Sequence, residues 1–538
     1  MRAYRGKTER KNQDKKTGNK KDGVKDVFGR FGKMRYFVVL EGIVVGAFGG
    51  GAVVLFRYGL EKVSVIIPYV IGRAGAHPWV IPVWFVALAA AAMVTRLLVF
   101  AEPMIGGSGI PQIKGEMHGY FDLVWWRVLL AKIAGGIITL GCGLCLGREG
   151  PSVQIGAMAG KGFSRMTGRM ITEERILITC GASAGLAAAF NAPLAGAIFV
   201  LEEIHKNYSL NVLLPALSAS ITADLVCRRV FGLAPVFDLS GARPIAGKYF
   251  WVVILMAVAI AVIGAAYNAS IAAAQDLYDI IGRKKAGGYL RTLIPFLCCG
   301  AVTFTLPQAL GGGSGLVMDV SDGLPIKLLV ILLVVRFFYS VISFSSGVPG
   351  GIFLPLLTMG AVCGGITHGL AQMAGIQLSL SGLVAIAMTA SFSAIVRSPV
   401  MGTVLLAEMT GNLDMVLFMA TAALIAYITA DLLGAEPVYE QLLQRILEKR
   451  EQITTLDSDK NVVTEMPVEL GSRICGKTVK ELALPDGCLL VSIDRDGTEI
   501  IPGGDTAIEP LDVLVVLCQA NRLHRVQNLL ENRCKARL

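Results

Sequence analysis

Three short stretches rich in glycine and proline contain the residues of this chain that could perform chemistry. They are Gly-Ser-Gly-Ile-Pro at 107–111, Gly-Arg-Glu-Gly-Pro at 147–151 and Gly-Val-Pro-Gly-Gly-Ile-Phe-Leu-Pro at 347–355. Proline suits the first turn of a helix because it has no N–H to leave unpaired there. A helix N-terminus carries about half a positive elementary charge and free N–H groups, so each stretch predicts an anion-binding helix end. Ends that converge on one point would hold a partly dehydrated anion and still let it leave.

Glu149 stands in the second stretch, where we expect a helix to begin at about Glu149–Pro151. A carboxylate in the centre of a membrane costs about 2.5–3.5 kcal/mol on insertion scales, and beside an anion it competes for the same positive groups. We therefore expect Glu149 to occupy the anion site when deprotonated and to leave it when protonated. The alternative is that Glu149 pairs with Arg148 and only ties the loop together.

A second pair of acids, Glu202 and Glu203, follows the apolar run 192–201 and precedes His205 and Lys206. This order is typical of a helix that reaches the membrane–water interface. The pair is therefore either a solvated helix end or an inner proton acceptor, and the residues alone leave both interpretations open.

The three stretches lie in a part of the chain that contains an internal sequence repeat. Residues 107–110 recur at 313–316, 151–160 recur at 355–364, and 191–196 recur at 397–402, about 205 residues later in each case. The chain therefore contains a duplicated unit of roughly 200 residues. Gly- and Pro-interrupted apolar segments in corresponding positions of two halves are typical of a transporter's binding site.

Composition places both halves in a membrane. The chain is 54% hydrophobic and 17% charged, with a mean hydropathy of +0.61, whereas soluble proteins carry about 25% charged residues. Stretches long enough to span a bilayer lie near 36–58, 78–100, 124–146, 249–274, 325–345 and 413–434. Shorter apolar pieces, broken by Gly and Pro, lie at 106–115, 147–166, 175–204, 347–372 and 382–410. Because non-helical backbone at membrane depth must be buried in protein or line a cavity, we expect half-length helices in a multi-pass protein.

The cysteines, histidines and possible catalytic motifs of the chain do not indicate an enzyme. The 11 cysteines and five histidines form no ligand pattern, and the chain has no Walker loop, dinucleotide fingerprint or Ser/His/Asp arrangement. Cys142 and Cys145 have the spacing of a redox or metal pair, but no histidine is near them in sequence. Small residues that allow close helix packing explain them better. We predict no enzymatic activity, no metal site and no cofactor, apart from an unidentified small ligand of the C-terminal domain.

The N-terminal tail, 1–34, supplies most of the net charge of +10. Residues 1–35 hold 13 Lys and Arg against 4 Asp and Glu. Basic residues beside a first span indicate a cytoplasmic tail, here retained and disordered. The alternative, a nucleic-acid-binding arm, is less well supported because the run has almost no aromatic residues, and we expect no nucleic-acid partner.

Taken together, the three stretches resemble the signature motifs of the CLC family of chloride channels and transporters. Asn-Ala-Pro-Leu-Ala-Gly at 191–196 and Glu-Pro-Val-Tyr at 436–439 strengthen the resemblance. It covers residues 35–445, with repeats of about 35–240 and 245–445. It implies an all-α, inverted-repeat membrane fold of many tilted and half-length helices, working as a homodimer with one ion pathway per subunit.

The resemblance also implies which residues bind the anion. By motif, the hydroxyls of Ser108 and Tyr439 would hold a central chloride, together with the backbone N–H groups of Ile352 and Phe353. N–H groups around Gly147, Arg148 and Glu149 would line the outer part of the site.

Proton coupling follows from the same resemblance. Glu149 matches the gating and proton-carrying glutamate, and Glu203 matches an inner proton-transfer glutamate that channel members lack. Ser108, rather than proline, implies a preference for chloride over nitrate, and the fluoride-exporting branch lacks the tyrosine of this motif. Lys114 departs from the pattern, because some bacterial exchangers carry an acid there, so the inner proton path is expected to differ.

For residues 460–538 the sequence predicts a soluble α+β domain. Strands are predicted at 462–469, 488–493, 498–501 and 511–518, with a hairpin turn at 496–497 and helices at 477–482 and 521–532. Four short motifs lie in this segment: Gly-Lys-Thr-Val-Lys-Glu-Leu at 476–482, Val-Ser-Ile-Asp-Arg-Asp-Gly-Thr at 491–498, Pro-Gly-Gly-Asp at 502–505 and Asp-Val-Leu-Val-Val at 512–516. Together they resemble the TrkA-C (RCK_C) domain of potassium-channel regulators. A dimerising module and a ligand sensor remain equal alternatives, and a ligand turn at 503–505 is the less favoured reading of that segment.

We therefore expect a multi-pass cell-membrane protein, with both termini cytoplasmic, that exchanges chloride for protons. The alternatives are a passive, voltage- or pH-gated chloride channel and, from another class, a membrane receptor or scaffold that does not transport. Neither alternative requires two acids within the membrane.

Overall fold

The structure is a computed structural model, and its described part begins at residue 37. The basic tail predicted at 1–34 lies outside it. The shorter gaps are 170, 233–234, 240, 283–286, 455–460, 469–471, 483, 486, 496–497, 511, 520–525, 527–528, 531–532 and 535–538. The chain divides near residue 443 into two compact units, which are described separately.

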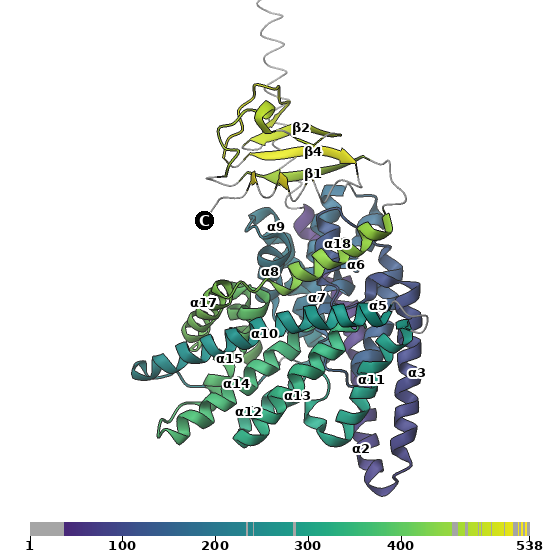
Figure 1. The fold of residues 1–538 in the computed structure, drawn as a ribbon, viewed down its shortest axis with the longest axis vertical. Helices are drawn as coiled ribbons and strands as arrows, with labels where there is room; N and C mark the ends of the chain where they lie inside the picture. The colour runs from purple at the N-terminus through teal and green to yellow at the C-terminus, as the bar shows by residue number, and fades with distance from the viewer. Residues whose placement is uncertain are drawn as a thin grey trace, which may run out of the picture. The chain divides into compact units, whose positions relative to one another are not determined.

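The first unit is built from helices packed at many inclinations (Figure 1). Its first half contains a helix over 37–64 and then α2 (Ile66–Ala76), α3 (Val80–Ala101), α4 (Ile110–Met117), α5 (Trp125–Gly141), α6 (Glu149–Thr167), α7 (Ile171–Phe190), α8 (Pro193–Phe199) and α9 (Leu210–Phe231). Its second half contains α10 (Phe250–Gly282), α11 (Gly287–Thr305), α12 (Ser314–Gly323), α13 (Ile326–Ser345), α14 (Phe353–Met373), α15 (Leu380–Val396), α16 (Pro399–Thr410) and α17 (Val416–Leu432). Helix α18 (Val438–Thr454) follows, and short 3₁₀ turns lie at Pro103–Ile105, Gly247–Tyr249 and Pro307–Ala309.

Seven helices of the described chain are long and apolar enough to cross a membrane. The predicted multi-pass, helical membrane fold is confirmed, and so are the half-length helices, of which α4 and α8 have 8 and 7 residues. Three of the seven, α9, α11 and α14, were not among the predicted spans, and α14 was predicted instead as the shorter, interrupted piece at 347–372. Charged residues interrupt the apolar sequence of α9, whereas Gly, Thr and Pro residues together with Arg291 lower the mean hydropathy of α11 to 1.2. The predicted spans at 124–146 and 413–434 are shorter helices, α5 and α17, of 17 residues each.

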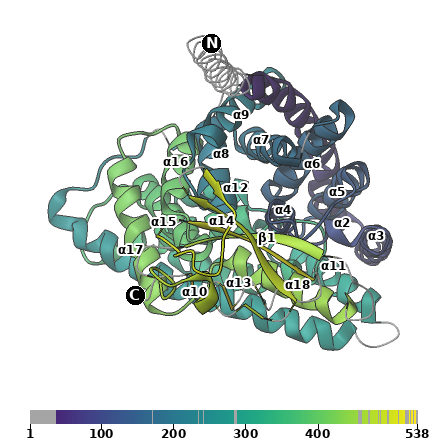
Figure 2. The same cartoon turned by 90° about the horizontal axis from the view of Figure 1, so that it is seen from above.

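The two halves repeat each other's architecture. Helices α6 and α7 pack together in the first half, as α14 and α15 do in the second. Figure 2 shows the blue helices α6–α9 on one side of this unit and the green helices α14–α17 on the other. The halves also cap each other's helices: Glu202 accepts the N–H of Met401 (2.6 Å) at the start of α16, and Glu408 accepts the N–H of Ala195 (2.8 Å) at the start of α8.

The second unit contains a four-stranded antiparallel sheet in the order β1-β4-β2-β3. Its strands are β1 (Asn461–Pro467), β2 (Cys488–Arg495), β3 (Thr498–Ile500) and β4 (Val513–Gln519), close to the four predicted runs. The predicted helix at 477–482 is a 3₁₀ turn, Val479–Leu482. The predicted turn at 496–497 and most of the predicted helix at 521–532 lie outside the described residues. A core that includes Leu482, Ile493 and Leu514 closes this small α+β unit.

Candidate functional site

Main-chain hydrogen bonds join the three glycine-rich stretches, although they are up to about 240 residues apart in sequence. The Gly107 N–H donates to the Val348 carbonyl at 3.1 Å, and the Gly350 N–H donates to the Gly107 carbonyl at 3.0 Å. Gly147 and Gly351 exchange two such bonds, of 2.6 and 2.8 Å. The convergence expected of the helix ends is therefore present, and a ribbon of glycine backbone forms its centre.

Glycine is required in this ribbon by close approach. A Cβ on Gly147 would run into the Glu149 carboxylate and lie 3.0 Å from the Leu354 nitrogen. A Cβ on Gly150 would collide with the Ser108 hydroxyl and lie 2.7 Å from the Ser108 carbonyl oxygen. Side chains at these positions would fill the space in which the Glu149 and Ser108 oxygens lie.

Three helices begin at this point. Helix α6 begins at Glu149, as expected, α14 begins at Phe353, and α4 begins at Ile110 after Gly109, whose φ of 97° favours glycine. The first N–H groups of each helix have no partner within the helix. The Glu149 carboxylate lies beside the N-terminus of α14, close to the Leu354 N–H. The residue therefore stands where an anion would be held by two helix ends.

Four buried oxygens at this junction have no hydrogen-bond partner among the described residues. They are both carboxylate oxygens of Glu149 and the hydroxyl oxygens of Ser108 and Tyr439. Glu149 and Tyr439 are fully buried, and Ser108 is 2% exposed. Leaving a buried polar group without a partner costs about 1–3 kcal/mol, so such a set fits a site that takes its partner from outside the protein.

Arg148 does not pair with Glu149 in the described structure, because both Glu149 oxygens and the Arg148 Nε lack partners there. The Arg148 side chain instead helps to line a cavity of about 460 Å³, together with Leu354 and the glycines at 311–313. The positively charged Arg148 therefore lines the cavity that adjoins the start of α14. The loop-tying alternative for Glu149 is not what this geometry shows.

The other anion-site residues named from sequence lie at the same junction. Ile352 and Phe353 are fully buried at the start of α14. The Phe353 ring packs against Phe190 and Phe392, with centroids 5.4 and 4.6 Å away, which anchors this helix end. The Gly147 N–H is engaged by Gly351, so Gly147 contributes close approach rather than a free donor.

A buried lysine that the sequence reasoning missed positions the first stretch. Lys132, on α5, is fully buried and donates to the carbonyl oxygens of Ile105 (2.8 Å) and Gly107 (2.7 Å). It thereby turns these carbonyl oxygens toward itself. In the second half, Arg336 donates to the carbonyls of Ala309 (3.1 Å) and Gly312 (2.7 Å). Lys132 and Arg336 stand 204 residues apart, so extending the repeat comparison to isolated basic residues would have found them.

Glu202 and Glu203 have separate environments. Glu202 caps α16 by accepting the N–H groups of Val400 and Met401. Glu203 lies in a π-helical turn, Val200–His205, a form common at functional sites. Its side chain is 3% exposed and contacts Lys114 at 3.3 Å. A solvated helix end therefore does not describe Glu203, which is a buried acid.

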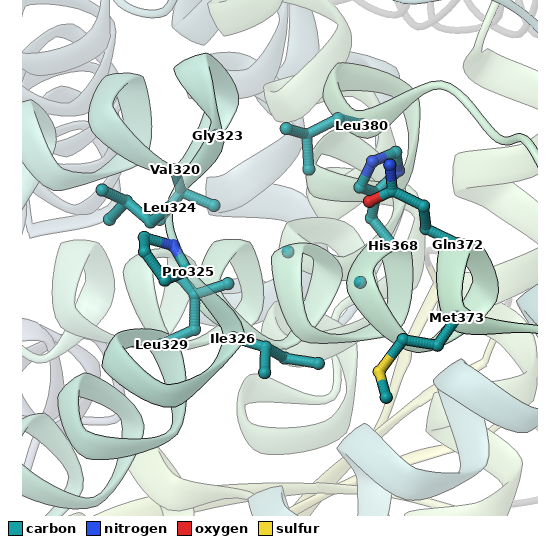
Figure 3. A pocket seen from close by; sticks show the side chains of 12 residues that line it. Val320, Gly323, Leu324, Pro325, Ile326, Leu329, His368, Gln372, Met373 and Leu380 are labelled. Atoms are coloured by element: carbon teal, nitrogen blue, oxygen red, sulfur yellow. The ribbon is translucent and has the colours of Figure 1, made fainter.

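A further cavity of about 400 Å³ lies away from this junction, between the ends of α12 and α14 and the start of α13 (Figure 3). His368, Gln372 and Met373 line one side of it, and Val320 and Leu324 line the other. None of the converging stretches contributes a residue, so this cavity is not part of the candidate site.

Two known families match separate parts of this chain. The family described as "Voltage gated chloride channel" matches residues 86–431, and the family described as "TrkA-C domain" matches residues 463–531.

Curated relatives match most of the chain. The H(+)/Cl(-) exchange transporter ClcA of Vibrio parahaemolyticus serotype O3:K6 is 34% identical over 461 residues, covering 82% of this chain and 96% of that protein. The protein of the same name from Salmonella paratyphi B is 34% identical over 425 residues, covering 77% and 89%.

Solved structures show the same fold. A slow cyanobacterial Cl-/H+ antiporter superposes with a TM-score of 0.72 and 27% identity, covering 77% of this chain and 98% of that one. A CLC-type fluoride/proton antiporter superposes with a TM-score of 0.61 over 73% of this chain, at 19% identity, which shows the fold alone. With the family match over 86–431 and relatives 34% identical over most of the chain, this protein belongs to the voltage-gated chloride channel (CLC) family and carries a C-terminal TrkA-C domain.

Proposed function

We propose that this chain is a secondary active transporter that exchanges chloride for protons across the cell membrane. The observation that carries the proposal is the Glu149 carboxylate, fully buried, unpaired among the described residues and placed beside the start of α14. A carboxylate there occupies the place of an anion. Its protonation and departure would free that place for chloride, which links the two ions in one site.

The working cycle follows from this competition. With Glu149 deprotonated, its oxygens take the positive helix ends and chloride is excluded from the outer part of the site. When Glu149 gains a proton, its attraction to the helix ends falls, and chloride enters to meet the hydroxyls of Ser108 and Tyr439 and the N–H groups of Ile352 and Phe353. Glu203, the second buried acid, would relay the proton on the inner side of the site.

A passive chloride channel is the second candidate within transport. It would use the same anion residues but has no need of a buried second acid such as Glu203. The relatives named H(+)/Cl(-) exchange transporter favour exchange. A receptor or scaffold without transport would not need the unpaired oxygens at the junction of α4, α6 and α14.

The assembly, orientation and regulation belong to the proposal as well. We place both termini on the cytoplasmic side, because the basic residues gather before the first span, and we expect a homodimer with one pathway per subunit and no cofactor. The TrkA-C domain would tune transport, either as a dimerising module or as a sensor of a small ligand. For the segment 503–505 we favour an ordinary turn over a ligand site. Asp505 pairs with Lys480 at 2.8 Å, and the Gly503 N–H donates to the Thr506 hydroxyl.

The deciding experiment compares the purified wild type with Glu149→Gln in proteoliposomes. A chloride gradient should drive protons uphill in the wild type. Glutamine mimics the protonated glutamate and cannot titrate, so the variant should pass chloride without coupled protons. Chloride flux without proton movement in the wild type would favour the channel. Uphill proton movement in the variant would show that Glu149 is not the coupling acid.

A further inference from the structure

A cluster of charged side chains surrounds the buried acid Glu203. Lys114, on α4, places its Nζ 3.3 Å from Glu203 Oε1 and 2.7 Å from Glu440 Oε1. Lys206 pairs with the same oxygen of Glu440, and the Ser398 hydroxyl donates to Glu203 Oε2 at 3.1 Å. One ammonium group therefore joins two carboxylates that come from distant parts of the chain.

The exposure of these side chains rises in order from Glu203 outward. Glu203 and Lys114 are each 3% exposed, Glu440 is 26% exposed and Lys206 is 52% exposed. Water therefore reaches Glu440 but not Glu203. Glu440 also follows Tyr439 directly at the start of α18, so the cluster adjoins the anion site through the backbone.

We propose that protons travel between water and Glu203 through Glu440 and Lys114, which makes Lys114 a proton-carrying residue of the exchange reaction. This inference rests on the exchange function proposed above and names the route by which its inner acid is reached. Lys114 is the group in contact with both carboxylates, at distances that allow a hydrogen bond to each.

The transfer can be written as two balanced steps. In the first, an N–H bond of the Lys114 ammonium breaks and its proton forms an O–H bond on Glu203 Oε1, leaving a neutral amine and a neutral acid. In the second, a proton that Glu440 has accepted from water moves to the amine, restoring the ammonium and the Glu440 carboxylate. A neutral pair is accessible because removing both charges of a buried ion pair from water is costly. One proton thus passes from water to Glu203, and the reverse order releases it.

The remaining groups around Lys114 leave its ammonium to the two acids. His118, one turn further along α4, directs its Nδ1 to the Lys114 carbonyl oxygen at 2.7 Å rather than to Nζ. Lys206 contacts Glu440 from the exposed side and keeps that carboxylate in reach of Lys114.

Lys161 offers a matched control within the same chain. It is also buried and also contacts two acids, Glu116 and Asp122, but it additionally donates to the Leu123 carbonyl. It lies on α6 beyond the converging stretches, and its hydrogen-bond partners among the described residues include no residue of the anion site or of the Glu203 cluster. A lysine-to-arginine change there preserves a cation in a comparable environment.

The test measures chloride and proton fluxes of full-length Lys114→Arg and Lys161→Arg in proteoliposomes, beside the wild type. Arginine keeps the charge and the pairing but does not deprotonate in proteins. We therefore expect Lys114→Arg to retain chloride flux while its coupled proton flux falls roughly tenfold or more, the scale of a lost proton-transfer group. Glu440→Gln, which lacks the outer acceptor, should show the same selective loss, and Lys161→Arg should match the wild type.

The outcomes separate this inference from the function on which it rests. A wild type that moves no protons uphill would refute the exchange function itself. If Lys114→Arg moves protons as well as the wild type does, the route through Lys114 alone is refuted. Protons would then reach Glu203 through water. Equal losses in Lys114→Arg and Lys161→Arg would also refute it, because the effect would then be general to buried lysine pairs. Retained chloride flux shows in each case that the protein is folded.

Discussion

At the scale of single residues, the anion site consists of groups that the protein leaves unsatisfied. The buried Tyr267 hydroxyl, by contrast, lies 2.7 Å from the Ser340 hydroxyl. The Ser108 and Tyr439 hydroxyls have no such partner among the described residues. An anion that accepts from both would remove the cost of their burial. Hydroxyls rather than ammonium groups keep the ion from being held too tightly to leave.

The first prediction concerns Tyr439→Phe, which removes one of these hydroxyls and little else. Chloride affinity should fall by about 1.5–3 kcal/mol, the value of a hydrogen bond to a charged group. Isothermal titration calorimetry of the purified protein measures it. Tyr267→Phe is the control, because that hydroxyl already has a partner in Ser340, and its chloride affinity should not change. Equal affinities in all three proteins would remove Tyr439 from the site.

At the scale of elements, the site depends on how closely α4, α6 and α14 approach one another. Their starts meet at Ile110, Glu149 and Phe353. Between them, neither Gly147 nor Gly150 leaves room for a Cβ. Glu202 and Glu408 fix neighbouring helices by capping α16 and α8. The first N–H groups of α16 and α8, which have no partner within their own helices, are thereby paired.

The second prediction tests this close approach with Gly150→Ala. The new methyl group would meet the Ser108 hydroxyl and lie 2.7 Å from the Ser108 carbonyl, so the starts of α4 and α6 must separate. We expect chloride flux to fall by roughly tenfold or more, as misplacement of about 1 Å can cost far more at an active site.

Gly315→Ala is the control for this change, because Gly315 lies in the second copy of the 107–110 stretch and a Cβ there has nothing within 4 Å. It should leave flux unchanged. Size-exclusion profiles establish that both variants fold. Wild-type flux in Gly150→Ala would show that the helix starts are less tightly packed than described.

At the scale of the whole molecule, the membrane unit and the TrkA-C domain have different kinds of stability. The first buries polar groups at an ion pathway. The second is a small sheet with one apolar core, reinforced by Arg495, whose Nε and Nη2 each donate to Asp512 at 2.8 Å. Burial alone would raise the pKa of Asp512, but the bonds from Arg495 and the Glu509 N–H outweigh it and hold that pKa below its usual value.

The third prediction follows from the sign of this shift. A carboxyl whose pKa is lower in the folded state stabilises it fully above the unfolded pKa of about 3.9. The free energy of unfolding of the isolated domain should therefore decrease as the pH falls below about 4 and through the lowered pKa.

Asp512→Asn should abolish that part of the pH dependence and lower stability at neutral pH by about 2–3 kcal/mol, through loss of a charge-assisted pair. Urea unfolding measures both effects. The control is Asp505→Asn, whose partner Lys480 and own side chain are 68% and 89% exposed, so that little should change. An unaltered pH profile in Asp512→Asn would refute the assignment.

The fourth prediction concerns a truncation after Arg450, which removes the TrkA-C domain. The anion site draws its last residue from Tyr439, so the truncated protein should fold and still exchange chloride for protons, at a rate different from that of the full chain. Parallel flux measurements in proteoliposomes decide the matter. A folded, inactive truncation would make the domain part of the transport machinery, and identical flux under all nucleotide and ion conditions would leave it a stabilising module.

Much of this molecule can be derived from sequence because the constraints are local. A bilayer imposes long apolar stretches, a proline after glycines marks a helix start, and alternating apolar residues mark strands. These rules predicted the membrane fold, the start of α6 at Glu149 and the four strands of the C-terminal sheet. They missed α9 and α11 because the charges within these helices have partners in three dimensions, such as Asp224 with Arg228 and Asp279 with Arg291.

Other features were decided by the tertiary structure alone. Without the family resemblance, the residues could not separate Glu202 from Glu203, because adjacent acids on one helix look alike until their partners are known. One caps α16 and the other is buried against Lys114. Likewise, Lys132 only interrupts an apolar span in the sequence. Its positioning role becomes clear from the structure, which shows the carbonyl oxygens that it binds. Local sequence determines helix ends and spans, whereas the cost of burying a charge depends on partners that only the folded chain brings together.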